Sequence, residues 1–536
     1  MRLKLLLITL LLYPPLVALL PHLAHAQTCT PAPLDKYRYL RRLSLDLRGH
    51  LPSYEELAAL DPLPDVPPEW IDKWLQDPQF LQVARALHET WLWPNISNVS
   101  MSDVAVTLAE NNNTQIWSVQ GAGRRKLWRK GTGSEVCGNW QQTQFDNGVP
   151  IAQAVTDSTG KVLYQQDGWV EVKPYWAPET TIHVCAFDAM TADQGLKNPC
   201  GTRIGVNDAH CGCGPNLRWC YAPGVQTEVE VQLREQFLRA VDDAVLGKYQ
   251  ELLTSLKIWL NPRLDFWRKY LAPMSTSTKT WNMPTSSDPP QAANPDWMQT
   301  TWYAANRAGQ LNGMGLHSGI LTLPAYALRF QTNRGRANHF RIVFESQYFI
   351  PPASTLDHDC VQGAADLTTA CLCRGCHQVL EPLAAYFAPL TEAGSSVVTD
   401  AEMPDYDPKC DPAKTKNPTP TCDRFYATDP AAARPGWRLT HQWANLGDPL
   451  HQRIAQNLQQ GPGGFAKQAL ESGSFVTATV QNLWKVLLHR PVIVDPLAAE
   501  DETAQLTQLA AHLQKSGDFR ALVKELVQLP SYRSVR

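Results

Sequence analysis

One short stretch of the chain combines two cysteines and a histidine at a spacing that can hold a cofactor. In CLCRGCHQVLEP, Cys373, Cys376 and His377 form the pattern C-x-x-C-H, the attachment signature of c-type haem. In such a site the two sulfurs reach the vinyl groups of one porphyrin, and the adjacent imidazole points at the iron. Residues 378–387 predict a helix that carries His377. The sequence therefore predicts one covalently attached haem c with His377 as the proximal iron ligand.

Zinc or a disulfide could use the same side chains. Cys371, Cys373, Cys376 and His377 offer four ligands, but structural zinc sites usually pair two separated ligand clusters. An oxidising compartment also disfavours a zinc site and favours disulfides. The pattern favours haem, while the zinc and disulfide interpretations stay open at this point.

The chain has 13 cysteines, an odd number, so they cannot all pair with one another. Assigning two of them to haem still leaves one free or intermolecular thiol, for which Cys29 and Cys371 are candidates. Cys410 with Cys422 is a plausible local bridge, and Cys360 is a candidate partner for Cys371. A further group lies in a region rich in Gly and Pro and predicts a cross-linked loop: Cys137, Cys185, Cys200, Cys211, Cys213 and Cys220.

The sixth ligand of the iron has several candidates. His317 comes first, because it opens the apolar run HSGILTLPAYALRF, and Met403 comes second, because its loop could fold back over the haem. His339 and His358 are further candidates, and each of these side chains could instead be an ordinary packed or surface residue. A His/His or His/Met pair favours electron transfer, whereas an open position permits peroxide or other small ligands.

Two arginines could bind the propionates of the same haem. Arg334 and Arg336 lie in TNRGRANHF, and a guanidinium pairs with a carboxylate through two parallel hydrogen bonds. The alternative is that both belong to a solvated turn.

The first residues predict export. A short basic start leads into the apolar run 5–20, and Ala24-His25-Ala26 is a small-x-small cleavage signature. These features predict a signal peptide over residues 1–26. Pro14 and Pro15 and the shortness of the apolar run argue against a membrane anchor. We therefore expect an exported protein, in the periplasm or the outer cell envelope, with peripheral membrane association possible.

Charge and motifs exclude several classes of function. The formal net charge is −3, which gives no indication of a nucleic-acid partner. The chain has no G-x-S-x-G, H-E-x-x-H, P-loop or dinucleotide-binding glycine pattern. The expected partner is a redox protein or a component of the envelope, and whether the chain is an enzyme is left open.

The helices and strands that must position the haem motif form a mainly α, multidomain chain. Ser53 with Glu56 predicts a capping box at a helix start, and Leu233, Phe237 and Val241 mark the apolar face of a long helix. The runs KVLYQQ and WVEVKPYW predict strands. The expected regions are a helical domain at 27–93, a Cys-rich, partly β insertion at 94–225, a helical segment and linker at 226–296, a haem-binding region at 297–434 and a helical domain at 435–536.

Four segments resemble a known family, in the order in which that family has them. They are YLRRLSLDLRGHLPSYEELAAL, GLHSGILTLPAYALRFQTNRGRANHF, CRGCHQVLEPLAAYF and VQNLWKVLLHRPV with the residues that follow it. The family is that of the planctomycete-type secreted c-type cytochromes, multidomain proteins built from domains of unknown function around one C-x-x-C-H motif. The resemblance implies a cytochrome c-like segment in which Cys373, Cys376 and His377 hold the haem. The insertion at 94–225 and the long loop at 391–425 depart from the family pattern.

These observations lead to one main functional hypothesis and two alternatives. The main hypothesis is a secreted monohaem c-type cytochrome that transfers electrons in the cell envelope. A haem enzyme of the peroxidase type, with an open distal side, is the first alternative. The second is a surface binding or scaffold protein with a structural haem, in which the Cys-rich insertion recognises the partner.

Overall fold

The fold is known from a computed structural model of the chain. The structure describes residues 32–96, 106–120, 128–131, 136–271, 297–302, 316–348, 373–398, 401–416, 422, 425–428, 435–438, 457–458, 460–497 and 501–535. The predicted signal peptide, the predicted linker at 274–296, and Cys29, His358, Cys360 and Cys371 lie outside these ranges.

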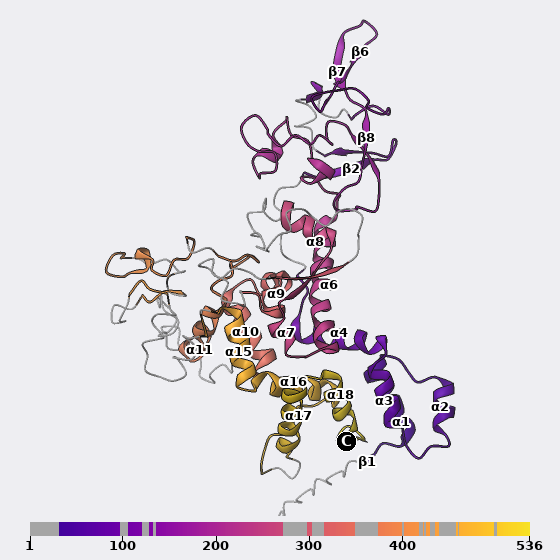
Figure 1. Cartoon of the computed structure of the whole chain (residues 1–536), viewed down its shortest axis with the longest axis vertical. Coiled ribbons are helices and arrows are strands. Elements are labelled where there is room, and N and C mark those ends of the chain that lie inside the picture. Colours follow the sequence, from indigo (N-terminus) through magenta and orange to yellow (C-terminus); the bar gives the residue numbers. More distant parts are fainter. Residues whose placement is uncertain are drawn as a thin grey trace, which may run out of the picture.

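Helices dominate the chain, as the sequence predicts. About 46% of the described residues are helical and 13% lie in strands of several small sheets. Figure 1 shows a helical body with a strand-rich lobe at one end and the helix α11 at its side. The main helices are α1 (Lys36–Arg48), α2 (Tyr54–Leu60), α3 (Pro68–Leu75), α4 (Pro78–Leu92), α6 (Val225–Leu246), α7 (Glu251–Thr254), α8 (Pro262–Phe266), α9 (Pro324–Arg329), α10 (Asn333–Phe344), α11 (Arg374–Ala384), α15 (Pro462–Glu471), α16 (Ser474–Leu487), α17 (Thr503–Ser516) and α18 (Phe519–Gln528).

Capping side chains define the ends of the first helices. The Asp35 carboxylate accepts hydrogen bonds from the backbone N–H groups of Tyr37 and Arg38 at the start of α1. Gly49 ends α1 at a φ of 76°, a left-handed conformation that glycine adopts without a Cβ clash. The predicted capping box of α2 is confirmed, because the Ser53 hydroxyl accepts from the Glu56 N–H and the Glu56 carboxylate accepts from the Ser53 N–H.

The two ends of the described chain pack together. Strand β1 (Ala32–Pro33) pairs antiparallel with β12 (Ser534–Val535), and α3 packs against α18. One continuous cluster of buried side chains extends from Tyr39 to Tyr532 and includes residues of the helical regions at both ends. The N-terminal and C-terminal helical regions therefore share one core.

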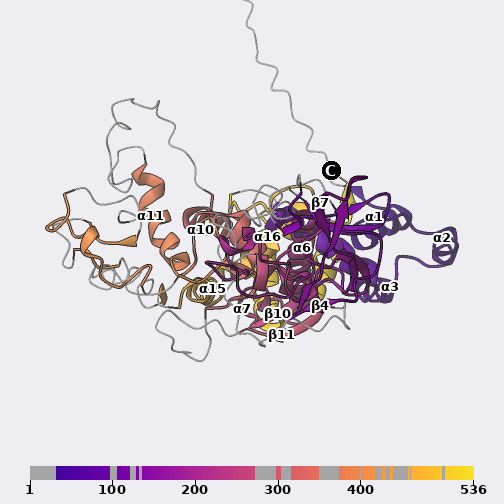
Figure 2. The ribbon, with the colours of Figure 1, turned by 90° about the horizontal axis from the view of Figure 1, so that it is seen from above.

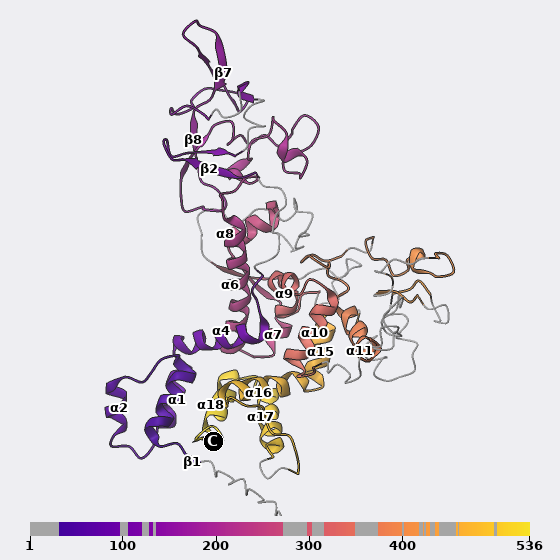
Figure 3. The same ribbon diagram turned by 180° about the vertical axis from the view of Figure 1, so that it is seen from behind.

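The long helix α6 is the central element of the helical body. It contacts α4, α9, α18 and the strand β10 (Lys257–Leu260), and Figure 3 shows it running from the body towards the lobe. Leu233, Phe237 and Val241 are buried along one side of it, as the apolar periodicity predicts. β10 pairs antiparallel with β11 (Met298–Thr301) beside this helix.

The described residues of 106–221 form a Cys-rich lobe with several short strands, and many of their buried side chains join the core of the helical body. Its main sheet has the order β2-β3-β9-β8, formed by Leu108–Asn111, Ile116–Val119, Ile182–Cys185 and Trp169–Val172. Two hairpins extend from it, β4 (Phe145–Asp146) with β5 (Val149–Pro150) and β6 (Gln153–Thr156) with β7 (Val162–Gln166). Three disulfides link its chain segments: Cys137–Cys185, Cys200–Cys211 and Cys213–Cys220.

The disulfides are typical of an oxidising, extracellular compartment. Besides the three in the lobe, Cys410 pairs with Cys422, as the sequence predicts. Such bonds persist outside the reducing cytosol. Within the ranges that the structure describes, no helix combines the length and the apolar character that crossing a membrane requires.

Candidate functional site

The C-x-x-C-H motif begins α11. Cys373 is the residue that caps the helix, and its carbonyl accepts hydrogen bonds from the N–H groups of Cys376 at 3.1 Å and His377 at 2.9 Å. The helix ends at Ala384 and continues as one short 3₁₀ turn, Ala385–Phe387. The predicted helix over 378–387 is therefore confirmed. Figure 2 shows α11 at the side of the helical body.

Cys373 and Cys376 both carry free thiols. The other eight cysteines in the described ranges are all bonded in pairs, whereas these two are not bonded to each other or to any of the eight. Both are partly exposed. The structure therefore leaves two accessible sulfurs on the first turn of one helix, directly before a histidine.

The His377 ring is anchored by a carboxylate of its own helix. Its Nδ1 lies 2.5 Å from Oε1 of Glu381, one turn further along α11, and the Glu381 side chain is only 5% exposed. An ionised carboxylate only accepts hydrogen bonds, so this contact places the ring proton on Nδ1. The lone pair is then on Nε2, which makes no hydrogen bond to any described residue. Nε2 is the atom with which such a histidine binds a metal.

Glu381 also receives an ion pair from the neighbouring helix α10. Nε of Arg334 lies 2.6 Å from the same Oε1, and the Arg334 side chain is 23% exposed. Oε2 of Glu381 is buried and has no hydrogen-bond partner in the described part of the chain. The arginine predicted to bind a haem propionate thus lies on the carboxylate that orients His377. Whether it also reaches a propionate stays a prediction.

Glu381 is the site residue that sequence reasoning missed. Its signal was the spacing of four residues from His377, which brings two side chains onto the same face of a helix. The motif itself ends at the histidine and carries no information on the residue that orients it.

Arg336, two residues after Arg334, is fully buried. Its guanidinium donates to the Asn333 side chain at 2.7 Å and to the backbone carbonyls of Ala327, Thr391 and Gly394 at 2.8 to 3.0 Å. Burial lowers the pKa of Arg336 to about 10. These bonds favour a role in fixing the loop after α11 over the predicted contact with a propionate.

His317, the first candidate for the distal ligand, has both ring nitrogens engaged. Its Nδ1 lies 2.7 Å from the Thr322 hydroxyl, and its Nε2 lies 3.4 Å from the carbonyl of Lys257. The ring packs on Trp302 with 4.6 Å between ring centroids, and burial lowers its pKa to about 3. In this arrangement His317 is a packed, neutral residue, and ligation of iron would require both bonds to break.

Met403, the second candidate, lies in a small core of its own. It is 7% exposed and packs with the Cys410–Cys422 disulfide, Phe425 and Tyr426. Ala388, which directly follows the 3₁₀ turn after α11, packs against this cluster. The Met403 loop therefore lies against the segment that carries the motif, and its role as a ligand stays a prediction.

His339 is another buried histidine, on α10. Its Nε2 donates to the carbonyl of Trp91 at 3.0 Å, and its ring stacks on Phe330 with 4.0 Å between centroids. Nδ1 is buried and makes no hydrogen bond in the described ranges. Burial lowers the pKa of His339 to about 4, so the ring is neutral at physiological pH.

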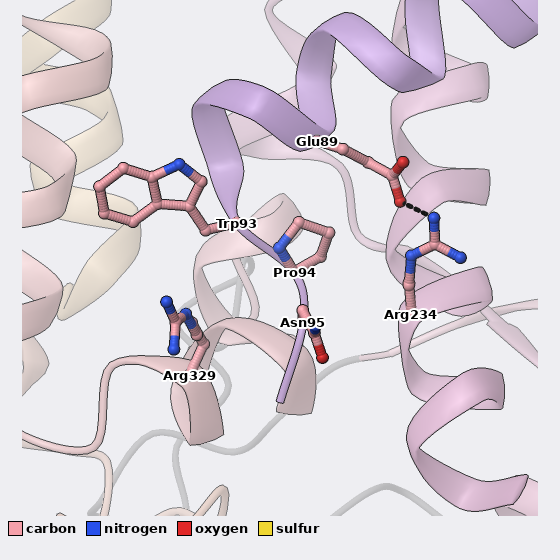
Figure 4. A pocket seen from close by; sticks show the side chains of 6 residues that line it. All are labelled: Glu89, Trp93, Pro94, Asn95, Arg234 and Arg329. Atoms are coloured by element: carbon pink, nitrogen blue, oxygen red, sulfur yellow. Dashed lines mark ion pairs between the residues drawn. The ribbon is translucent and has the colours of Figure 1, made fainter. Parts of the chain in front are cut away.

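A hollow of about 460 Å³ lies near His339, between the end of α4, α6 and α9. Figure 4 shows the six residues that line it: Glu89, Trp93, Pro94, Asn95, Arg234 and Arg329. Glu89 is ion-paired with Arg234, while Arg329 extends an exposed guanidinium from α9. The lining contains no thiol, hydroxyl nucleophile or histidine, and its one carboxylate, Glu89, is held in the ion pair with Arg234.

The described residues contain no group of three or more His, Cys, Asp and Glu side chains that could hold a metal ion by themselves. The zinc interpretation of the motif therefore has no support from this part of the chain; Cys371, its fourth ligand, lies outside it. The chain matches no protein-family model, no curated protein and no solved structure.

Proposed function

We propose that the protein is a monohaem c-type cytochrome that transfers electrons in the cell envelope. The observation that carries this proposal is the first turn of α11, where two free thiols directly precede a histidine with an available Nε2. Cys373 and Cys376 would tether the porphyrin, and His377 would bind the iron. A haem bound there supplies a metal that accepts and releases one electron.

The residues present fit such a group. Both thiols are partly exposed, so attachment does not require the core to open. The His377 side chain is 20% exposed, and its Nδ1 is already occupied by Glu381. The Glu381 carboxylate keeps the ring proton on Nδ1, which leaves Nε2 for the metal, and it restricts rotation of the ring. Outer-shell partners of metal-bound histidines act in the same way.

The position of α11 suits exchange of electrons with another protein. It lies at the side of the helical body (Figure 2), and Cys373, Cys376 and His377 are partly exposed. The disulfides support an oxidising compartment, and the predicted signal peptide supports export to the periplasm or outer envelope. The resemblance to the secreted c-type cytochromes supports the same assignment. The proposed partner is a redox protein of that compartment.

A peroxidase-type haem enzyme is the second candidate. The hydrogen bond from His377 to a buried carboxylate favours it, because such a bond strengthens the histidine as an electron donor to the metal. The engaged nitrogens of His317 leave the distal side to another of the predicted candidates, such as Met403, or to a small ligand.

Mass spectrometry tests the haem. The full-length protein, produced together with a haem-attachment system, should carry the added mass of one haem. The variant Cys373→Ser with Cys376→Ser should carry none. Cys410→Ala with Cys422→Ala is the matched control, because it also removes two cysteines but should retain the haem. A wild-type protein without porphyrin mass contradicts the proposal.

Optical spectra then distinguish the two candidates. Electron transfer predicts a low-spin spectrum that carbon monoxide and cyanide leave unchanged, because two protein ligands fill the axial positions. A high-spin spectrum that responds to these ligands indicates an open site and favours the enzyme. Met403→Ala should convert the first spectrum into the second if Met403 is the distal ligand.

A further inference from the structure

We propose that Glu381 and Arg334 form a charge pair that positions His377 and sets the reduction potential of the iron bound to it. This inference rests on the proposed haem. It assigns to Glu381 the role of a positioning residue, since its carboxylate acts on the metal through the His377 ring, and it assigns to Arg334 the role of moderating that carboxylate.

The geometry concentrates both contacts on one oxygen. Oε1 of Glu381 lies 2.5 Å from His377 Nδ1 and 2.6 Å from Arg334 Nε, while Oε2 has no hydrogen-bond partner among the described residues. His377 is hydrogen-bonded to this oxygen, whereas Arg334 Nε makes no hydrogen bond in the described part of the chain and contacts the oxygen as an ion pair. A stronger contact between one of them and this oxygen should therefore weaken the contact of the other.

The burial of Glu381 strengthens its electrostatic interactions with both His377 and Arg334. The Glu381 side chain is 5% exposed, and the charge of a carboxylate is screened weakly where water is excluded. A buried carboxylate without a partner is strongly destabilising, so the chain must supply a cation or a strong donor. Arg334 supplies the cation from α10, the helix that packs against α11.

The two charges act on the iron in opposite directions. A negative charge behind the histidine favours the ferric state and lowers the reduction potential, and a strong hydrogen bond to Nδ1 adds to this by strengthening ligand donation. The positive charge of Arg334 favours the ferrous state and also draws Oε1 away from His377. Removing either residue should therefore shift the potential, with opposite sign.

The simpler interpretation is that the ion pair only joins α10 to α11. In that case either substitution would lower stability, but neither would have a reason to move the potential in a defined direction. The potential is thus a readout that a purely structural role would not move.

The experiment uses the full-length, haem-loaded protein and the variants Glu381→Gln, Arg334→Gln and the double variant. Mass spectrometry first confirms that each carries haem, and equilibrium redox titration then gives the potential. Glu381→Gln should shift the reduction equilibrium towards ferrous at least tenfold, which is about 59 mV for one electron. Arg334→Gln should shift it towards ferric. The double variant should lie between the two, because the net charge is restored.

The matched control is a second arginine–glutamate pair remote from the motif. Arg490 and Glu502 form a partly buried ion pair near the C-terminal helices, and Arg490→Gln or Glu502→Gln should leave the potential unchanged. Glu381→Asp keeps the charge on a shorter side chain and should shift the potential less than Glu381→Gln. It serves as the test if the glutamine variant does not fold.

The outcomes separate this inference from the proposed function. If the wild type carries no haem, the proposed function fails and the pair has no iron to act on. If the variants retain haem but their potentials are unchanged or move in the same direction, the assignment to Glu381 and Arg334 is wrong while the cytochrome stands.

Discussion

The hydroxyl of Tyr39 donates a hydrogen bond of 3.0 Å to the backbone carbonyl of Val527, although 488 positions separate the two residues in the chain. Tyr39 is 2% exposed, and the guanidinium of Arg533 lies over its ring at 4.2 Å. Burial raises the pKa of Tyr39 to about 12, so the hydroxyl stays protonated and keeps donating over the whole physiological range. One side chain thus joins the first helix to the last.

Removing that hydroxyl should destabilise the whole body. In Tyr39→Phe the Val527 carbonyl stays buried without its donor, which should lower the free energy of unfolding by about 1–2 kcal/mol. Chemical denaturation measures this loss. Tyr37→Phe is the control, because the Tyr37 hydroxyl binds Asp61 at the exposed surface and water can replace it. Equal losses in the two variants would contradict the prediction.

Arg336 should tolerate no substitution by lysine. Its planar guanidinium donates hydrogen bonds to four surrounding acceptors. A lysine ammonium cannot place its donors in the same plane and directions. Arg336→Lys should lower the free energy of unfolding by about 3 kcal/mol or more, because it leaves buried carbonyls and a buried charge poorly paired. Thermal melting measures the effect, and Arg329→Lys at an exposed position of α9 should be nearly neutral. A stable Arg336→Lys protein would show that the guanidinium geometry is not needed.

Near-neighbour signals allowed much of the helical fold to be predicted. The capping box at Ser53 and Glu56 involves residues three apart, and the apolar face of α6 repeats within single turns, so both could be recognised without tertiary information. The lobe could be predicted only as Cys-rich and partly β. Its six cysteines allow many pairings, and the order β2-β3-β9-β8 depends on contacts between distant segments.

The buried His88 should make stability depend on pH. Its Nδ1 donates to the Ala84 carbonyl at 2.7 Å and its Nε2 accepts from the Tyr249 hydroxyl at 2.9 Å, while burial lowers its pKa to about 4. The unfolded histidine titrates near its ordinary value of about 6.5, so between these values only the unfolded state binds the proton. The free energy of unfolding should therefore fall as the pH drops from about 6.5 to 4.

His88→Gln isolates this contribution. Burial raises the pKa of Glu345 to about 7, which acts in the opposite direction, but this effect cancels in the difference between wild type and variant. The stability advantage of the wild type should shrink by roughly 3 kcal/mol between pH 7 and pH 4, at 1.36 kcal/mol for each pKa unit. Denaturation series at several pH values measure it. A constant difference would mean that His88 does not titrate as its burial implies.

The Cys410–Cys422 disulfide should hold the Met403 loop. It closes a loop over a sequence separation of 12, for which loss of a disulfide costs about 3 kcal/mol. In Cys410→Ala with Cys422→Ala, hydrogen exchange should increase around Met403 while α16 and α18 stay protected. Removal of Cys213–Cys220 in the lobe is the control and should leave Met403 unaffected. If Met403 binds the iron, the first variant should also weaken the low-spin spectrum.

Of the candidate site, only the residues of the C-x-x-C-H motif could be predicted from the sequence. Cys373, Cys376 and His377 are adjacent in sequence, so the motif alone identifies them. The partner of His377 depends on which residue lies one turn further along α11 and on its burial, and the partner of Arg334 depends on how α10 packs against α11. The first relationship has only the four-residue spacing as its signal, and the second has no signal in a short pattern. Arg336 shows this limit of sequence reasoning. It lies two residues from Arg334, yet its guanidinium binds backbone carbonyls of the loop after α11 and not Glu381.

The lobe leaves and rejoins the body where two segments of the chain lie side by side. Thr107 and Tyr221 form a β-bridge, and the Leu108 N–H donates to the Tyr221 carbonyl at 2.9 Å. Below this point α4 and α6 pack directly on each other. The lobe also packs on α8, where Tyr175 stacks on Phe266 and Arg263 donates to the Trp176 carbonyl. A few Gly and Ser residues in place of 109–219 should therefore expose apolar surface of α8 and lower the stability of the helical body, as thermal melting followed by circular dichroism can check. The lobe is therefore held to the body by side-chain packing as well as by its two chain connections.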